Sequence, residues 1–403
     1  MPTGTDGNRD AARCWAAQLE DWILQNGLRG YDPFDVKAHP LLRTAQPYPL
    51  LRKGSSLLLD LFPMAARRLL RIEPTSNAKA YALCAHAELR LYQVSGDDRH
   101  MTRAMEHLDW LCRHRAAGAA GWSWGYPFDV SGKGIHRPAG TPVGVVTSVA
   151  GEAFALAHAI TGDEHHRKAV AQIGDFFLRG IGQIPQPDGT VCFSYTPLDQ
   201  WPVHNANLHA VAHLFRAAAI TGDASYGEAA EPGLAFSLGR QRADGSWPYG
   251  ECSPSDDYEK ALLDTVDHHH TGFVLRSLHE IYALTERPEI REAIVRGFEF
   301  YQRQLFTNDG IPRITTRSTY PINIHACAEG ILCAAVLSGL VPDALPIAAR
   351  TIEWTRRHMA SPATGLPYYR KYPWFTNRLL CTRWGLAWTF YALCEYLYRV
   401  SPG

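Results

Sequence analysis

The fold is decided by residues 204–223, HNANLHAVAHLFRAAAITGD. The second half of this stretch is a run of Ala and large apolar residues, which is typical of a helix buried on every side. The first half is different, because it crowds His204, Asn205, Asn207 and His209 into six positions. An apolar helix that begins on a polar cluster predicts a core helix whose N-terminus lies at a functional site.

The same pattern recurs along the chain. A helix with the same Ala-Ile-Thr-Gly-Asp ending stops at Asp163, and a third ends in Ser-Gly-Asp at Asp97. The repeats predict six inner helices, over 78–97, 145–163, 204–223, 268–286, 323–339 and 379–398. Amphipathic outer helices are expected after the first five, over 99–115, 166–179, 226–240, 289–305 and 345–358. Segments 9–26 and 55–71 can supply the sixth outer partner.

Six inner helices ringed by outer helices predict an all-α fold, the (α/α)6 toroid, which is a barrel of six helical hairpins. We expect one domain over 1–403, with 1–75 supplying N-terminal outer helices and a long loop. An open helical solenoid is the alternative, but six units is the number that closes a ring. The short turns make every inner helix run the same way, so all the N-termini and the long loops share one end. We call this end the mouth, and we expect the functional site there.

Composition excludes several classes of protein. The chain has 403 residues, 46% of them hydrophobic, and its formal net charge is zero. No basic run indicates nucleic acid, and no polybasic helix indicates an anionic membrane. The N-terminus lacks a signal-peptide pattern, and no apolar run reaches membrane-spanning length. The nine Cys are scattered without a Cys-x-x-Cys pair, so we expect reduced thiols in a cytoplasmic protein.

Polar residues gather where the third to sixth inner helices are expected to begin. Asn205 and His209 are four residues apart and therefore share a helix face. Single residues have a simpler explanation, since Asp267 is a good helix cap and a lone His is often a satisfied core residue. Histidine is not a preferred cap, however, so the whole group favours a site. The candidate catalytic residues are His209, His269, Asn205, Asn207, Tyr195, Tyr320, Asp267 and His325.

The long loops interleave aromatic residues with charged ones. Sugar rings pack their apolar faces on Trp or Tyr, and their hydroxyls need oriented polar groups. Anchoring of the loops is the alternative role for any one aromatic residue. We expect an oligo- or polysaccharide substrate, either free or attached to a lipid. The candidate substrate-binding residues are Trp122, Trp124, Tyr126, Asp129, Asp199, Trp201, Trp247, Tyr249, Arg317, Tyr369, Arg378 and Arg383.

Six motifs in this order resemble a family of bacterial toroid proteins encoded among exopolysaccharide and O-antigen biosynthesis genes. The motifs are GYDPFD (30–35), GWSWGYPFD (121–129), FSYTPLDQWPVHNAN (193–207), DGSWPYG (244–250), DHHHTGF (267–273) and YPINIH (320–325). The resemblance implies a cytoplasmic role in making or tailoring a surface glycan. More distantly, the layout is similar to the toroid domains of glucuronyl C5-epimerases and of alginate- and heparin-type lyases. Their Asn-His pairs at an inner-helix start have counterparts in Asn205, Asn207 and His209.

Four chemistries fit these residues. The favoured one is proton abstraction at C5 of a uronic acid unit, leading to epimerisation or β-elimination. It needs a group that neutralises the carboxylate, a base and an acid. The set comprises Asn205 or Asn207 as neutraliser, His209 or His269 as base, Tyr195 or Tyr320 as acid, and Arg317 or Arg378 as anion clamp.

The other three chemistries use different residues. Glycoside hydrolysis needs paired carboxyls, for which Asp129, Asp199, Glu251, Asp257 and Asp267 are available. An isoprenoid or metal-dependent enzyme is indicated by LGRQRADGSW, which resembles the Gln-Trp repeat of triterpene cyclases. In that case Cys252, Asp267, His269 and His325 would bind zinc; otherwise no cofactor is predicted. A non-catalytic glycan-binding protein would use the same aromatic residues.

Overall fold

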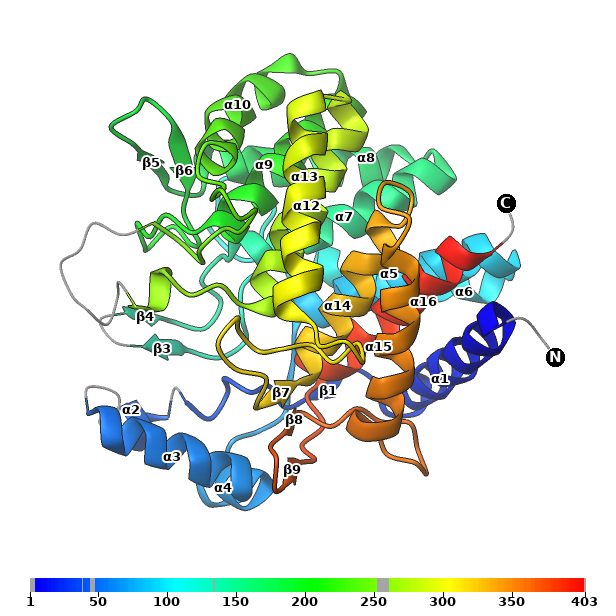
Figure 1. Ribbon diagram of the computed structural model, residues 1–403. Helices are drawn as coiled ribbons and strands as arrows, with labels where there is room; N and C mark the ends of the chain where they lie inside the picture. Colours follow the sequence, from blue (N-terminus) through cyan, green and yellow to red (C-terminus); the bar gives the residue numbers. More distant parts are fainter. Residues whose placement is uncertain (1–3, 38, 44–47, 133–134, 252–260, 402–403) are drawn as a thin grey trace.

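The computed structural model describes residues 4–37, 39–43, 48–132, 135–251 and 261–401 (Figure 1). Six inner helices form a ring, and each packs against the next. The last packs against the first, so the ring is closed and the predicted toroid is confirmed over the open solenoid. The inner helices are α5 (Ala78–Ser95), α7 (Gly144–Thr161), α9 (His204–Thr221), α12 (His268–Thr285), α14 (Ile324–Leu337), and the π-helical turn η1 (Thr382–Ala387) continued by α16 (Trp388–Val400).

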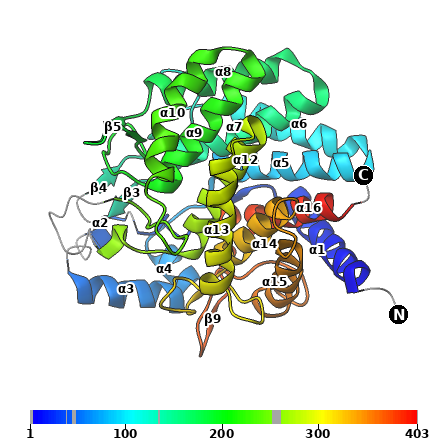
Figure 2. The same cartoon turned by 45° about the horizontal axis from the view of Figure 1, so that its top comes forward.

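Six outer helices surround this ring, each packed on its neighbouring inner helix, and α8 packs on both α7 and α9. They are α6 (Asp98–Arg113), α8 (Glu164–Arg179), α10 (Ala224–Leu238), α13 (Pro288–Leu305), α15 (Ala344–Met359) and α1 (Gly4–Asn26), the last packed on α16. The expectation that 55–71 shares the sixth outer position is wrong. That segment lies in α3 (Pro49–Leu61) and α4 (Pro63–Leu69). These helices stand beside the ring with the short α2 (Pro40–Arg43) in the view of Figure 1 and in the turned view of Figure 2. The segment's leucines face outward and cannot pack on an inner helix.

The Thr-Gly-Asp turns explain why the hairpins are so tight. Gly162 and Gly222 end α7 and α9 with φ of 69° and 77°, a left-handed conformation that glycine adopts without strain. The next residue then caps the following helix. The Asp163 side chain accepts a hydrogen bond from His165 N, and Asp223 accepts one from Ser225 N. One short motif therefore stops an inner helix and starts an outer one.

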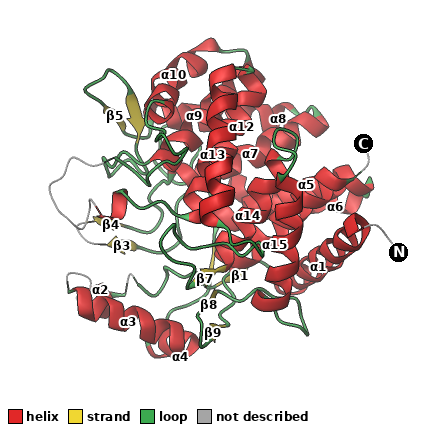
Figure 3. Cartoon of the chain, viewed as in Figure 1, coloured by secondary structure: helices red, strands yellow, loops and turns green. Residues whose placement is uncertain are grey.

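The long loops carry short antiparallel strands and lie at the mouth, as expected. The strands are β1 (Arg29–Gly30) with β2 (Thr75–Ser76), β3 (Val130–Gly132) with β4 (Ile135–Arg137), β5 (Gln183–Pro185) with β6 (Val191–Phe193), and β7 (Ile322–Asn323)–β8 (Arg370–Lys371)–β9 (Thr376–Asn377). Loop backbone pairs with the residue just before an inner helix, as Gly250 does with Val203 and Thr315 with Asp267. Figure 3 shows the strands and long loops on the left and lower sides, with both termini on the right.

Among the described residues, one helix is long and apolar enough to cross a membrane. This is α7, which corrects the expectation that no apolar run reaches that length. It packs against α5, α8 and α9, and 61% of it is buried in the ring. Its apolar character is accounted for by its place as an inner helix.

Candidate functional site

One register of the inner helices brings polar side chains to the mouth. The second residue of five of the six helices is polar or charged, and in α7 it is Val145. Because the six helices begin at the same level of a closed ring, their second residues form one layer around its axis. This layer consists of Lys79, Asn205, His269, His325 and Arg383.

Asn205 and His209 are buried, and polar atoms of both side chains lack hydrogen-bond partners among the described residues. Their exposed fractions are 1% and 2%, and they lie one turn apart on the same face of α9. Neither the amide oxygen nor the amide nitrogen of Asn205 has a hydrogen-bond partner among the described residues, and the same holds for Nε2 of His209. Buried polar groups are rarely left unsatisfied without a reason. Burial lowers the pKa of His209 well below its usual value, so its ring is neutral.

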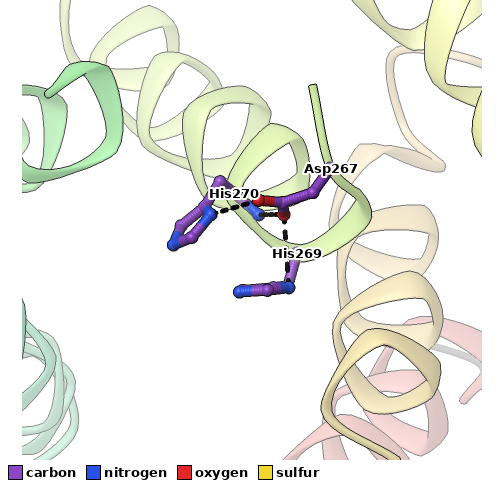
Figure 4. A group of neighbouring side chains, drawn as sticks. All are labelled: Asp267, His269 and His270. Atoms are coloured by element: carbon purple, nitrogen blue, oxygen red, sulfur yellow. Dashed lines mark hydrogen bonds and ion pairs between the residues drawn. The ribbon is translucent and has the colours of Figure 1, made fainter. Parts of the chain in front are cut away.

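Asp267, His269 and His270 form a compact group at the start of α12 (Figure 4). Nδ1 of His270 lies 2.6 Å from Asp267 Oδ2, and Asp267 Oδ1 caps His270 N at 3.0 Å. Nδ1 of His269 lies 3.2 Å from Asp267 Oδ1 but is not aligned for a hydrogen bond. Burial lowers the pKa of His269 to about 3, which keeps this imidazole neutral. Burial raises the pKa of Asp267, but His269 and His270 lower it by more, so the carboxylate stays charged.

His325 is held beside this group by Trp384. The two rings are stacked with centroids 4.0 Å apart, and His325 Nδ1 lies 3.2 Å from the Trp384 carbonyl. The His269 ring is 5.2 Å from the His325 ring, centroid to centroid. Burial lowers the pKa of His325 well below its usual value. The mouth therefore presents three neutral imidazoles, on α9, α12 and α14.

Lys79 is a member of this layer that the sequence prediction missed. It is 2% exposed, and its Nζ lies 4.4 Å from the ring centroid of Trp388 and 5.4 Å from that of Phe273. No carboxylate of the described residues is within ion-pairing distance of it. Burial, followed by the neighbouring charge of Arg383, lowers its pKa well below the usual value. The sequence did contain a hint, since this lysine is the second residue of an Ala-rich inner helix, the position that Asn205 has in α9.

Arg383, a predicted substrate-binding residue, is engaged in a buried ion pair. Its Nε and Nη2 donate to Asp32 at 2.6 and 2.9 Å, a bidentate pair in which both residues are almost fully buried. The loop 30–35 thus lies over the mouth, which answers where the GYDPFD motif belongs. The Arg383 guanidinium also lies 4.9 Å from the ring centroid of Tyr126.

Three tyrosines complete the mouth. Tyr126, Tyr195 and Tyr249 are half-buried, and burial raises the pKa of each phenol, so all three are protonated at neutral pH. The Tyr249 ring lies 4.4 Å from that of His270. Each phenol is therefore a candidate hydrogen-bond donor or general acid.

Asn207 does not belong to the site, contrary to prediction. Its Nδ2 donates to Gly233 O at 2.7 Å and to Ser237 Oγ at 3.0 Å, while its Oδ1 accepts from Phe193 N at 3.0 Å. This amide joins α9 to α10 and β6. His204 has a similar role, with Nδ1 near Ser237 Oγ and Nε2 3.0 Å from Glu251 Oε1.

Several predicted sugar platforms are structural instead. The Trp124 indole donates to Leu111 O at 3.0 Å, and the Trp247 indole donates to Ser237 O at 2.8 Å. Both rings are buried. Trp122 packs under the Arg115 guanidinium, 4.2 Å from its ring centroid. Tyr369 is buried with Leu379 and Cys381, and the half-buried Trp201 packs against the main core.

The predicted loop acids are occupied by loop contacts. Asp199 accepts from Tyr195 N, from Thr196 Oγ1 at 2.6 Å and from Arg137 Nη2 at 2.8 Å. Asp129 accepts from Ala139 N at 2.9 Å. Both fix loop shape rather than flank a bound sugar. The structure places Tyr320, Arg317 and Arg378 at the surface, with exposed side chains.

The zinc alternative is only partly described. Cys252, a predicted zinc ligand, lies outside the described residues, and so does Asp257, which was named for hydrolysis. Asp267, His269 and His270 offer three ligand atoms within 4.8 Å of one another, but Asp267 is already engaged by His270 and by its helix cap. A second such group, Glu20, Glu88 and His100, is balanced by its own charges, because Arg103 also pairs with Glu20.

Comparisons with known proteins agree with the toroid. The structure is similar to the cellobiose 2-epimerase of Bacillus thermoamylovorans, with a TM-score of 0.63 at 9% identity over 80% of this chain and 87% of that one. An unsaturated glucuronyl hydrolase specific for heparin aligns over 98% of this chain and 97% of its own, with a TM-score of 0.59 at 13% identity. A D-mannose isomerase gives 0.59 at 12% identity over 80% and 86%. At these identities the likeness establishes the fold. No family model and no curated protein matches the sequence.

Proposed function

We propose that this protein is a carbohydrate-active enzyme that abstracts the C5 proton of a uronic acid unit. The observation that carries the proposal is the excess of nitrogen groups over carboxylates around the axis of the mouth. Within the described part of the chain, Lys79 has no ion-pair partner and the Asn205 side chain has no hydrogen-bond partner. A bound carboxylate would supply an ion-pair partner for Lys79 and a hydrogen-bond partner for Asn205. It would also raise the pKa of each neighbouring imidazole toward the range useful for a base.

The surroundings suit a sugar ring. Trp384, Tyr126 and Tyr249 are half-buried aromatic residues next to the polar layer. An apolar sugar face packs on such rings, while its hydroxyls reach Asp267, His270 or a phenol. The fold neighbours act on carbohydrates by their names, and they include an epimerase and an isomerase. These similarities support the substrate class.

The chemistry divides into two steps. In the first, Lys79 and Asn205 bind the carboxylate, and His209 or His269 takes the proton from C5 as electron density moves into an enediolate. In the second, either a proton returns to the opposite face of C5, or the C4–O4 bond breaks while a phenol protonates the departing oxygen. The first outcome is epimerisation and the second is β-elimination. Tyr195 and Tyr249 are the candidate acids.

Hydrolysis has less support from the geometry. Of the acids named for it that the structure describes, Asp129 and Asp199 hold loops, Glu251 contacts the buried His204, and only Asp267 stands at the mouth. A paired-carboxylate mechanism needs a second acid across the scissile bond. Asp267 has histidines as its neighbours instead.

A product screen separates these chemistries. The full chain is incubated with oligosaccharides that contain uronic acid and with the same oligosaccharides after carboxyl reduction. Proton abstraction predicts either a changed ratio of C5 epimers by NMR or an unsaturated product that absorbs in the ultraviolet, and only with the uronates. New reducing ends without unsaturation would instead establish hydrolysis. Binding without any product would leave a glycan-binding role.

A further inference from the structure

Helix α3 has its apolar face turned toward solvent. At 3.6 residues per turn, the exposed leucines fall within an arc of about 120°. Leu50 alone is 84% exposed. In a helix packed on a globular core, the apolar stripe faces inward. Here the outward face carries Leu50, Leu51, Leu57, Leu58 and Leu61.

The polar side of α3 faces the protein. Asp60 is buried and accepts hydrogen bonds from Arg370 Nη1 at 3.0 Å, Tyr372 Oη at 2.5 Å and Asn377 Nδ2 at 3.0 Å. These three donors belong to the β8–β9 hairpin and its ends. The orientation of α3 is therefore fixed by specific bonds, and its exposed leucines are not the result of a loosely placed helix.

The apolar surface continues beyond α3. Phe62 and Leu69, on either side of α4, are exposed, and Trp374 at the tip of the β8–β9 hairpin is 74% exposed. A recess of about 530 Å³ lies between the start of α4 and the strand β9, lined by Phe62, Met64 and Leu380 among others. Figures 1 and 2 both show α3, α4 and β9 along the lower side of the molecule. We call this surface the α3 face.

The same segment is strongly basic in a chain of zero net charge. Residues 49–71 contain five basic residues and one acid, Asp60. Arg67 is neutralised by Asp35 at 2.7 Å, and Asp60 is neutralised by Arg370, but Arg68 and Arg71 are exposed without ion pairs among the described residues.

We propose that the α3 face binds the surface of an anionic phospholipid bilayer. Exposed leucines would enter the boundary between headgroups and acyl chains, Trp374 would lie at the headgroup level, and the arginines would contact lipid phosphates. A second copy of this chain is a poorer occupant, because it would bring the same basic residues against each other. The proposal does not depend on the chemistry of the mouth.

Membrane binding would also set the position of the mouth. Arg67 on α4 donates to Asp35 and, at 2.8 Å, to the Asp32 carbonyl, and the Asp32 carboxylate holds Arg383. This chain of bonds ties the α3 face to the loop that lies over the mouth. A glycan attached to a membrane lipid would therefore reach the site over a short path.

Vesicle co-sedimentation of the full chain tests the proposal. The probes are vesicles of phosphatidylcholine mixed with phosphatidylglycerol and vesicles of phosphatidylcholine alone, each at low and high salt. The test variant is Leu50→Ser/Leu57→Ser/Leu58→Ser. The matched control is Leu24→Ser/Leu198→Ser/Leu284→Ser, which removes three other exposed leucines elsewhere on the molecule. Circular dichroism melts confirm that both variants are folded.

The wild type and the control should sediment with the anionic vesicles, and binding should weaken at high salt. The test variant should bind roughly tenfold more weakly or worse, since each removed leucine side chain loses apolar burial. Arg68→Glu should also weaken binding. Failure of the wild type to sediment with anionic vesicles would overturn the proposal, as would equal binding by the test variant. A dimer in solution that only the test variant disrupts, without vesicle binding, would assign the face to a second copy.

Discussion

Asn205 and Asn207 lie two positions apart on α9 and have opposite environments. The Asn207 amide makes three hydrogen bonds to α10 and β6, whereas both polar atoms of the Asn205 amide are buried without a partner. A helix turns about 100° per residue, so residues two apart point to nearly opposite sides. Asparagine therefore has a structural role at position 207, where it joins α9 to α10 and β6, and is a candidate ligand-binding residue at position 205.

This contrast gives the first prediction. Asn207→Ala should lower the free energy of unfolding by roughly 2–4 kcal/mol, because it leaves buried backbone and hydroxyl groups unpaired. Asn205→Ala should change it by about 1 kcal/mol or less, since no bond is lost. Turnover should respond in the reverse sense, with Asn205→Ala losing roughly a hundredfold in kcat/KM. Denaturant melts and kinetics on the same two proteins measure both effects, and similar stability losses in the two would contradict the assignment.

The histidines of α12 allow a second matched comparison. The His268 ring packs against Tyr301 and Phe306, and its Nδ1 lies 2.9 Å from Leu305 O. His268→Ala should therefore destabilise the fold by roughly 2–3 kcal/mol. His269→Ala and His209→Ala should abolish turnover and leave the melting temperature nearly unchanged. A large loss of stability in the latter two would make them core histidines.

Lys79 carries the third prediction. Lys79→Met removes a buried amine that has no ion-pair partner among the described residues, so the free energy of unfolding should stay the same or increase. Binding of a uronate oligosaccharide should weaken by roughly tenfold or more, the value of a charge-assisted hydrogen bond. Calorimetric titration of the same oligosaccharide after carboxyl reduction is the control. An equal loss of affinity for both ligands would show that Lys79 does not recognise the carboxylate.

The fourth prediction concerns the closure of the ring. His100 on α6 contacts Glu20 on α1 and Glu88 on α5 at 3.2 and 2.6 Å. Hydrogen bonds to Glu20 and then Glu88 raise the pKa of His100 from 6.5 to about 9. The folded state therefore holds this proton more tightly, so the stabilisation is fully present below pH 6.5 and is lost as pH rises through 9.

Denaturant melts across this pH range should show the free energy of unfolding decreasing toward pH 9. His100→Gln should be less stable at neutral pH and should lose most of that slope. If the variant kept the slope of the wild type, another group would be responsible for it.

The ring could be predicted from the sequence because the local pattern of each hairpin identifies its inner helix and its turn. Apolar residues on every face mark α5, α7 and α9 as inner helices, and the Thr-Gly-Asp turns after α7 and α9 set their direction. The sequence predicted the mouth for the same reason. It did not distinguish Asn205 from Asn207, because that depends on which way α9 is rotated against α10.

Other residues needed tertiary contacts for their interpretation. Trp124 and Trp247 look like sugar platforms in a loop, and only their buried bonds to backbone carbonyls show that they anchor it. Arg383 was predicted to bind substrate, and only the structure shows that it pairs with Asp32, more than three hundred residues away in the chain. Lys79 was the one residue that the repeat alignment itself could have found, since it shares the second position with Asn205 and His269.

The most direct test of the central claim is the deuterium content at C5 of a uronate oligosaccharide recovered after incubation with the protein in heavy water. The account predicts that wild-type protein introduces deuterium at C5, either in the epimerised product or in recovered substrate, and that His209→Ala and Asn205→Ala do so far more slowly. It also predicts no exchange at C5 of the carboxyl-reduced oligosaccharide. Conversion of the uronate to product with protium retained at C5 would contradict proton abstraction and assign the mouth to a different reaction.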